Sequence, residues 1–483
     1  MRRVPAPLLA LLAIAFLVGT AWSLVNPAFQ TPDEAAHVAY AQSLAERSSL
    51  PGDEGRSVSS TEQATAAALM NADQTAGILD TRPEWSRAAA DRWAATEAGL
   101  PAAAREDGGG PNPAAPNPPL SYVADAAAYK VAGGGFFTRL WAMRMTSVLA
   151  FLLTVTGVWL LCGEVFRRDR VLQVAAAGAT ALAPMLGFLA GAVMPDPLVI
   201  ALSTLALWLG ARIVRRGIST RDALAFGVVV GLAGATKSAS LVLVPPALLA
   251  LAVGAWRARA RTGDTRAAVI ALAAWGAGIA ATLGVWVVTA RIIGRAAAAQ
   301  VSTAAGGSTP FNVREFLSYL WQFYLPKLPF MSAYERPNPT KPVFEYWVKG
   351  TWGNFGWLEV HFADPVHFVL VGVMVTVALL GVIALVRLRD RVDPWLLAFF
   401  TVAALTILAG LHWTDYRQIR GGALGFAQGR YLLPLAGLAA LLVALALRGL
   451  PARARGVGAA VVLAGMFTLT LFSFGLVLDR FYA

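Results

Sequence analysis

Two adjacent carboxylates and an imidazole follow the first apolar stretch of the chain, in the run Thr31-Pro32-Asp33-Glu34-Ala35-Ala36-His37. Charged side chains beside hydrocarbon are costly unless water, a partner or a function keeps them there. A carboxylate at that boundary meets both lipid and water, and it can act as a base toward a hydroxyl group. Asp33 is therefore the first candidate for a catalytic side chain.

The same run also has a purely structural explanation. Thr31 could cap a helix, Pro32 suits its first position, and Glu34 could complete a capping box. Asp33 would then only complement the positive end of the helix dipole. His37 would tether the carboxylates or lie on an ordinary surface. One carboxylate suffices for a cap, however, and the presence of two favours a further role for Asp33.

Other polar residues lie at the ends of apolar stretches on the same side of the expected membrane. They are Asp196 in Met194-Pro195-Asp196-Pro197, Lys237 in Gly234-Ala235-Thr236-Lys237, and Arg430 with Tyr431 in Gln428-Gly429-Arg430-Tyr431. Each has a simpler interpretation, as a helix start or as a cation that snorkels to lipid headgroups. Together they supply a carboxylate base and cations that could hold a phosphate leaving group, as transfer from a lipid phosphate requires.

The composition predicts that membrane-spanning helices position these residues. The chain has 483 residues, of which 57% are hydrophobic and 14% charged, whereas a soluble chain carries roughly a quarter charged residues. Apolar stretches of roughly 18 residues or more recur, each long enough to span a bilayer as a helix. We expect an all-α polytopic membrane protein whose eleven spans lie near 7–26, 140–162, 171–193, 196–214, 223–237, 238–255, 267–290, 366–386, 394–412, 430–447 and 456–478.

Basic residues predict the orientation of these spans. The N-terminus and alternate short connections contain 19 arginines, whereas the short connections of the other parity contain 4 basic residues, Lys237, Arg417, Arg420 and Arg430. The positive-inside rule places the N-terminus in the cytoplasm and the C-terminus outside, as in a bacterial plasma membrane. The net charge of +12 largely reflects this topology, so nucleic acid is not an expected partner.

The expected topology puts two long hydrophilic segments on the exoplasmic side. The five expected segments are the first span (1–26), the segment with the acidic run (27–119), the second to seventh spans (120–291), an aromatic-rich segment (292–365) and the last four spans (366–483). No cytoplasmic connection has room for a nucleotide-binding unit. The nearest match to a phosphate-binding glycine loop, Gly276-Ala277-Gly278, lies in an apolar span. There small residues serve helix packing, as they do in Gly227-x-x-x-Gly231.

The second long segment contains 11 aromatic residues between Trp321 and Trp357. An interfacial aromatic belt is the simpler interpretation. The alternative is a platform on which sugar rings or a lipid chain pack, with Trp352 and Trp357 among its candidates. Helices are expected at 33–47 and 313–324, and a helix too short to span the membrane at 120–132.

In order along the chain, these motifs resemble the GT-C superfamily of polytopic glycosyltransferases, and more closely a bacterial family of predicted membrane proteins allied to it. The resemblance extends over nearly the whole chain. It rests on the Pro-Asp-Glu-x-x-His run, Asn117-Pro118-Pro119-Leu120-Ser121-Tyr122, Arg144 with Ser147, Asp196, Gly234-Ala235-Thr236-Lys237, Trp352-Gly353-Asn354-Phe355-Gly356-Trp357 and Gln428-Gly429-Arg430-Tyr431-Leu432-Leu433-Pro434.

The resemblance implies transfer of a sugar from a polyprenyl-phosphate-linked donor to an exoplasmic glycan or lipid acceptor of the cell envelope, usually with inversion. It implies that Asp33 is the general base and Glu34 its neighbour. The residues implied to hold the donor phosphate and substrate are Lys237, Arg430, Arg417, Asp196, His37, Tyr431, Trp352 and Trp357.

The sequence departs from the superfamily pattern at two points. Asn117 stands where a histidine is more usual, which weakens any role carried over for that position. The first long segment contains no Asp-x-Asp pair, which leaves metal dependence open. The sequence predicts no specific cofactor. A divalent metal held by Asp33, Glu34 and His37 is an alternative.

Two other classes of function fit part of the pattern. A transporter or flippase of lipid-linked sugar intermediates also explains cations at membrane depth and an aromatic groove. Transporters, however, usually show internal repeats and charges near the bilayer midplane. A non-catalytic membrane protein of envelope assembly would need neither Asp33 nor Glu34.

Overall fold

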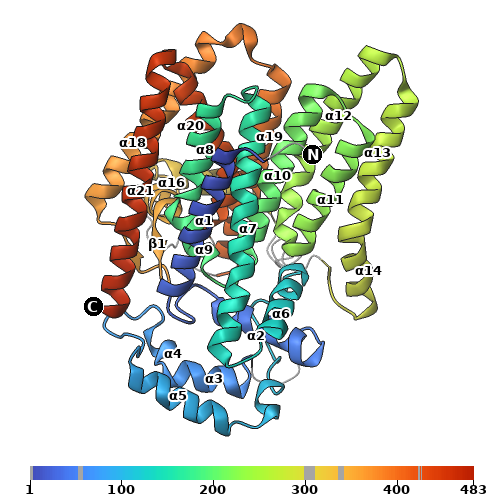
Figure 1. Ribbon diagram of the computed structural model, residues 1–483. Coiled ribbons are helices and arrows are strands. Elements are labelled where there is room, and N and C mark those ends of the chain that lie inside the picture. Colours follow the sequence, from blue (N-terminus) through green and yellow to red (C-terminus); the bar gives the residue numbers. More distant parts are fainter. Residues whose placement is uncertain (1–3, 53–57, 298–310, 335–341, 423–424, 426) are drawn as a thin grey trace.

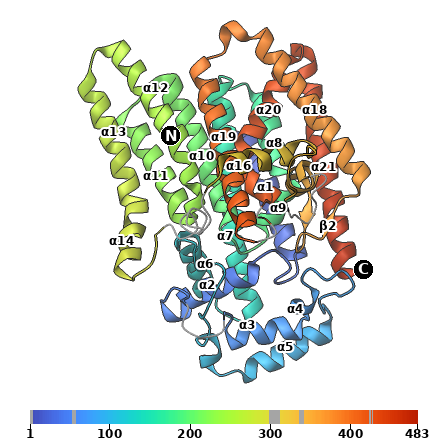
Figure 2. The ribbon, with the colours of Figure 1, turned by 180° about the vertical axis from the view of Figure 1, so that it is seen from behind.

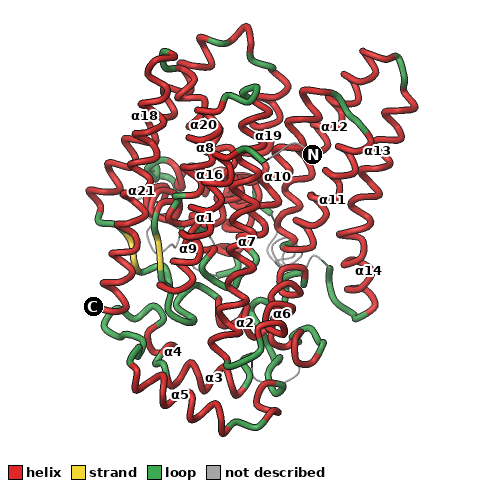
Figure 3. The backbone as a smooth tube through the Cα atoms, viewed as in Figure 1, coloured by secondary structure: helices red, strands yellow, loops and turns green. Residues whose placement is uncertain are grey.

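The computed structural model describes residues 4–52, 58–297, 311–334, 342–422, 425 and 427–483. Helices dominate these residues (Figure 3), and a short antiparallel hairpin pairs β1 (Asn354–Phe355) with β2 (Val360–His361). The α-helices are α1 (Ala6–Val25), α2 (Glu34–Arg47), α3 (Thr61–Leu69), α4 (Ala72–Thr75), α5 (Arg87–Gly99), α6 (Leu120–Ala132), α7 (Phe136–Val165), α8 (Arg170–Ala181), α9 (Pro184–Ala190), α10 (Asp196–Arg216), α11 (Thr220–Thr236), α12 (Val244–Thr262), α13 (Thr265–Ile279), α14 (Val285–Ile292), α16 (Val313–Tyr324), α17 (Gly350–Trp352), α18 (Asp364–Arg387), α19 (Pro394–Arg420), α20 (Ala436–Gly449) and α21 (Ala452–Tyr482).

Short helical segments of other types connect several of these helices. They are η1 (Ala102–Arg105), η2 (Ser238–Leu243), η3 (Ala280–Gly284), η4 (Val343–Lys349), η5 (Arg389–Arg391) and η6 (Gly429–Leu435). The helices expected at 33–47, 120–132 and 313–324 correspond to α2, α6 and α16.

The fold class predicted from the sequence, an all-α polytopic membrane protein, is confirmed. In the described residues, 9 helices are long and apolar enough to cross a membrane, or 10 if a bent pair counts as one span. The predicted span 171–193 is that bent pair. It consists of α8 and α9, which meet at 55° because Pro184 cannot continue the hydrogen bonding of the preceding helix. The predicted span 223–237 is α11, whose 17 residues fall at the lower limit for crossing a bilayer. It is not one of these candidates, so the described residues contain fewer candidate spans than the eleven expected.

Helices α11 to α14 stand along one side of the bundle, and α11 packs closely on α13 (Figures 1 and 2). A Cβ atom on Gly278 would lie 2.7 Å from the carbonyl oxygen of Leu224, and one on Gly227 would collide with the backbone of Trp275. The predicted role of these two glycines in helix packing is confirmed. Gly276 does not take part, since a Cβ atom there would have no neighbour within 4 Å.

Helices α2 to α6 of the first long hydrophilic segment lie at one end of the bundle, and the β1–β2 hairpin of the second segment lies next to that end (Figure 1). Trp357 of the second segment donates a hydrogen bond from Nε1 to the carbonyl oxygen of Phe29 in the first, at 2.9 Å. Arg480, at the end of α21, donates to the carbonyl oxygens of Ile78 and Thr81. We call this end, formed by residues 26–52 and 58–135 and the hairpin 354–361, the loop face.

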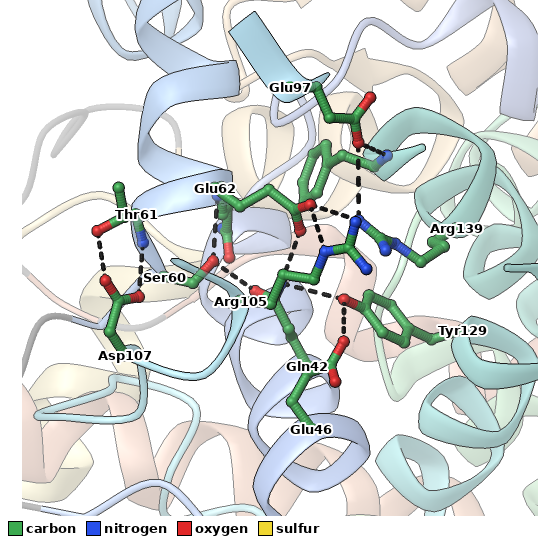
Figure 4. A network of polar contacts seen from close by, with 12 residues as sticks. Gln42, Glu46, Ser60, Thr61, Glu62, Glu97, Arg105, Asp107, Tyr129 and Arg139 are labelled. Atoms are coloured by element: carbon green, nitrogen blue, oxygen red, sulfur yellow. Dashed lines mark hydrogen bonds and ion pairs between the residues drawn. The ribbon is translucent and has the colours of Figure 1, made fainter. Parts of the chain in front are cut away.

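A buried polar network fixes the first long segment (Figure 4). Glu62 accepts hydrogen bonds from Arg139 at 2.6 Å and from Arg105 at 3.0 Å. Gln42 of α2 donates to Glu62 at 3.1 Å and to the hydroxyl of Tyr129 at 3.2 Å. The network ties α2 to α3, α6 and α7, and so holds the helix whose first turn carries the acidic run.

Candidate functional site

Asp33 occupies a sharp turn immediately before α2. Its backbone has φ 65° and ψ 3°, in the left-handed region, and its side chain makes no capping hydrogen bond to the helix. A residue other than glycine adopts this conformation at a cost, which is smallest for Asn and Asp. The turn directs the carboxylate away from its own helix, and 45% of the side chain is exposed.

The capping box expected of this run does not form. Helix α2 begins at Glu34, two residues later than a Thr31 cap would require. The hydroxyl of Thr31 is buried and has no hydrogen-bond partner among the described residues. The structural explanation therefore does not account for Asp33.

Glu34 was predicted to act beside Asp33, but the structure gives it a different role. Its side chain is 0% exposed and accepts hydrogen bonds from Arg144, from Nε at 2.8 Å and from Nη2 at 2.7 Å. The backbone N–H groups of Phe29 and Val193 donate to the same carboxylate at 2.9 Å and 3.1 Å. All of its acceptor positions face the protein, so Glu34 anchors α1, α7 and the α9–α10 turn and is not free to transfer a proton.

Arg430 of η6 is the partner of Asp33. Its Nη2 atom donates to Oδ2 of Asp33 at 2.9 Å, although 397 residues separate the two. Arg430 is 7% exposed, and its Nε–H is buried without a hydrogen-bond partner among the described residues. A buried guanidinium with an unused donor is costly, and the oxygen of an anion would satisfy it.

Tyr431 links this pair to a second one. The guanidinium of Arg430 and the ammonium of Lys237 each lie 5.2 Å from the centre of the Tyr431 ring, within range of cation–π attraction. Lys237, which follows α11, donates to Oδ1 of Asp196 at 2.9 Å. Asp196 is the first residue of α10. Four chain segments therefore bring together two cations and two carboxylates.

His37 lies beneath this group, in the first turns of α2. Its Nδ1 is 2.8 Å from the hydroxyl of Tyr122, which also accepts a hydrogen bond from the side chain of Asn117 at 2.9 Å. Burial lowers the pKa of His37 to about 4. The charges of Asp33 and Asp196 oppose this shift, but the imidazole is neutral at pH 7. Its contribution to the site is position and hydrogen bonding.

Tyr122 and Asn117 were not among the site residues predicted from the sequence. Both belong to the Asn-Pro-Pro-Leu-Ser-Tyr motif noted above, which was the available signal. Arg144 was likewise noted only as part of a motif. An arginine inside an apolar span indicates a buried anionic partner, and that partner is Glu34.

The remaining predicted residues, Trp352, Trp357 and Arg417, contact residues outside this group. Trp352 and Trp357 belong to the segment that supports η6, where a Cβ atom on Gly350 would lie 2.7 Å from the backbone nitrogen of Gly429. The indole of Trp357 bonds to Phe29, whereas that of Trp352 points to the sulfur of Met374 at 3.0 Å. Arg417 lies in the last turn of α19, 5.9 Å from the Trp413 ring.

The metal alternative does not fit the residues present. Glu34 faces Arg144 and not Asp33, so Asp33, Glu34 and His37 do not converge. Within the described ranges, no group of three His, Cys, Asp or Glu side chains is arranged to hold a metal ion.

The fold and the charged group at its loop face define a multi-pass helical membrane protein with a polar site at the end of the bundle. A family model matches residues 16–439. The chain therefore belongs to the family described as Predicted membrane protein (DUF2142). A comparison with curated proteins finds no match.

Several solved structures are similar to this chain, and two of them are described here. The oligosaccharyltransferase of Archaeoglobus fulgidus in its apo form shares 13% identity over 97% of this chain and 56% of its own length, with a TM-score of 0.49. ArnT from Cupriavidus metallidurans, bound to undecaprenyl phosphate, shares 16% identity over 93% of this chain and 61% of its own, with a TM-score of 0.43. The chain spans little more than half the length of the oligosaccharyltransferase. At these identities and scores, the function has to be derived from the site itself.

Proposed function

We propose that this protein transfers a sugar from a polyprenyl-phosphate donor to an acceptor of the cell envelope, with Asp33 as the general base. The observation that carries the proposal is the Asp33–Arg430 pair, in which a half-exposed carboxylate lies against a buried guanidinium that still has an unused Nε–H donor. This pairing combines a base with an anion-binding group. By the positive-inside rule, the loop face is exoplasmic.

The second cation extends the proposed phosphate site. Lys237 shares the Tyr431 ring with Arg430, so an anion between them meets both charges. Asp196 holds Lys237 in place through a 2.9 Å contact. The two carboxylates keep the group close to neutral without a ligand, and a phosphate that arrives would be balanced by cations already in position, which limits reorganisation.

The proposed reaction is a single displacement. Asp33 takes the proton of the acceptor hydroxyl, and the oxygen attacks the anomeric carbon from the face opposite the phosphate. As the new C–O bond forms, the bond to the phosphate oxygen breaks, and the polyprenyl phosphate leaves with the electron pair. Arg430 and Lys237 stabilise its charge, so no general acid is needed. The exposed part of Asp33 then returns the proton to water.

The test uses purified protein in detergent. The donors are polyprenyl phosphates that carry a radiolabelled hexose or pentose, and the acceptor is an envelope extract. Wild type is expected to transfer label, and Asp33→Asn is expected to lose about 10²–10⁴-fold of the rate. Asp80→Asn is the matched control, because Asp80 is an exposed carboxylate of the same long segment that lies outside the Asp33–Arg430 and Asp196–Lys237 pairs.

Transfer by Asp33→Asn at the wild-type rate would refute the assignment of the base. The same experiment separates the other functions, since detergent leaves no second compartment. A flippase would bind the donor without forming product. A non-catalytic assembly protein would neither bind the donor nor form product. Its function in cells would survive Asp33→Asn, a change that leaves the structural contacts of Glu34 in place.

A further inference from the structure

The opposite end of the bundle carries a basic cavity that sugar transfer does not use. Its volume is about 300 Å³, and it lies where α7 ends, where α7 turns into α8, and where α10 ends. The lining residues are Gly163, Glu164, Arg167, Arg168, Arg215 and Arg216. Four guanidinium groups therefore face one carboxylate.

The single carboxylate neutralises only one side of the cavity. Glu164 accepts hydrogen bonds from Arg216, including one from Nε at 2.9 Å, and lies 3.7 Å from Arg215. Arg167 and Arg168 are exposed, and within the described part of the chain their side chains take part in no hydrogen bond or ion pair. Positive charge is thus left over on the side formed by the α7–α8 turn.

The backbone of that turn is the second observation. Arg167 has φ 53° and Arg168 has φ 63°, so both lie in the left-handed region, where glycine or asparagine is strongly preferred. This turn ends α7: the N–H of Arg168 donates to the carbonyl oxygen of Gly163 in the last turn of that helix, at 2.9 Å. Two consecutive arginines at such positions contradict the local preference, and contradictions of this kind mark functional sites.

We propose that this cavity binds the phosphate of an anionic ester, either the headgroup of a phospholipid or a soluble phosphate ester. Guanidinium groups bind phosphate oxygens through paired, charge-assisted hydrogen bonds. The cavity lies at the ends of two membrane-crossing helices, α7 and α10, the depth at which basic pockets meet anionic headgroups on the cytoplasmic side. The positive-inside rule explains basic residues in this connection, but it explains neither the cavity nor the backbone.

The experiment measures the melting temperature of the purified full chain in mixed micelles that contain phosphatidylglycerol or phosphatidylcholine. A parallel titration uses soluble glycerol 3-phosphate. The variant is R167G/R168G, which removes both charges while glycine suits the turn, so it should fold with an unchanged or higher melting temperature. The matched control, R389G/R391G, removes two arginines from another short connection, where the side chain of Arg389 is 80% exposed.

Phosphatidylglycerol is expected to raise the melting temperature of wild type and of R389G/R391G, and R167G/R168G is expected to bind it at least about tenfold more weakly. A matching response to glycerol 3-phosphate would identify a site for soluble esters, and a response to phosphatidylglycerol alone would identify a lipid site. The proposal is overturned if neither compound acts, if R167G/R168G keeps the full response, or if R389G/R391G loses it equally. Sugar transfer plays no part in these measurements.

Discussion

The difference between the two neighbouring carboxylates can be tested by replacing each with its amide. Glu34→Gln is expected to destabilise the fold strongly, whereas Asp33→Asn is expected to leave it intact and inactive. The residues are adjacent, and each variant loses one negative charge while keeping its shape. Any difference in stability must therefore come from the environments of the two side chains.

The contacts of Glu34 determine how much folding free energy Glu34→Gln is expected to lose. Each of its oxygens accepts one bond from Arg144 and one from a backbone N–H, that of Phe29 or of Val193. In either orientation of the glutamine amide, its NH₂ group takes the place of one carboxylate oxygen. That NH₂ group then faces two other donors, one from Arg144 and one backbone N–H. One charge-assisted bond worth about 1.5–3 kcal/mol is lost, and a backbone donor is left unsatisfied at about 1–3 kcal/mol.

Together these losses come to about 2.5–6 kcal/mol, a range that includes the about 3–5 kcal/mol usual for breaking a buried ion pair by removing one partner. Arg144 keeps three carbonyl partners, those of Ser23, Asn26 and Pro27, which prevents a larger loss. Asp33 is half-exposed although Arg430 is buried, and the side-chain oxygen of an asparagine can still accept a hydrogen bond from Arg430, so Asp33→Asn is expected to cost only about 1 kcal/mol.

Thermal unfolding in detergent measures both variants. Glu34→Gln is expected to lower the melting temperature by on the order of 5–10 °C, and Asp33→Asn to change it by roughly a quarter of that. Glu84→Gln is the matched control, because Glu84 forms an ion pair with Arg92 at 2.6 Å but is half exposed. If Glu34→Gln unfolded at the same temperature as Glu84→Gln, the anchoring role would be refuted.

Three further predictions concern the support of the site. Gly429→Ala would push a Cβ atom into the backbone of Gly350 and should displace η6, lowering transfer activity at least about tenfold, whereas Gly465→Ala, with no neighbour within 4 Å, should transfer at the wild-type rate. Burial lowers the pKa of His37 from 6.5 to about 4, so the unfolded chain binds more protons between these values. Stability should fall by about 2 kcal/mol from about pH 7.5 to pH 5, and His37→Gln should remove that fall in thermal melts. Arg430→Lys keeps the charge but loses the planar fork, and should weaken binding of undecaprenyl phosphate by roughly 10–100-fold, as measured by titration calorimetry; equal affinity would exclude Arg430 from the phosphate site.

Much of the architecture follows from local pattern, and the site follows only in part. Apolar length and turn residues were enough to predict α2, α6 and α16 almost to the residue. They failed at α8 and α9, where the apolar stretch is continuous but Pro184 bends it. Hydropathy measures how much apolar chain is present, whereas a backbone break depends on one residue within it.

The charged groups that gather at the loop face could be recognised from the sequence, but their pairing could not. Glu34 and Arg144 are 110 residues apart, and Asp33 and Arg430 are 397 residues apart. Nothing local indicates which arginine each acid will meet. The alternative capping box was equally consistent with the same residues. It does not form, because Asp33 adopts a left-handed backbone and the helix begins two residues later than a Thr31 cap would require.

That backbone conformation is what separates the chemistry of two identical functional groups. Glu34, the first residue of α2, points into the bundle and accepts hydrogen bonds from four protein donors instead of water, so it stabilises the fold. Asp33, turned outward by φ 65°, keeps contact with solvent while its guanidinium partner is buried. A base must reach both a substrate hydroxyl and the water that finally takes its proton. Of the two carboxylates only Asp33 is in contact with solvent. Asp33→Glu keeps a carboxylate but suits the left-handed backbone less well than aspartate does, so it is expected to abolish sugar transfer in the same detergent assay.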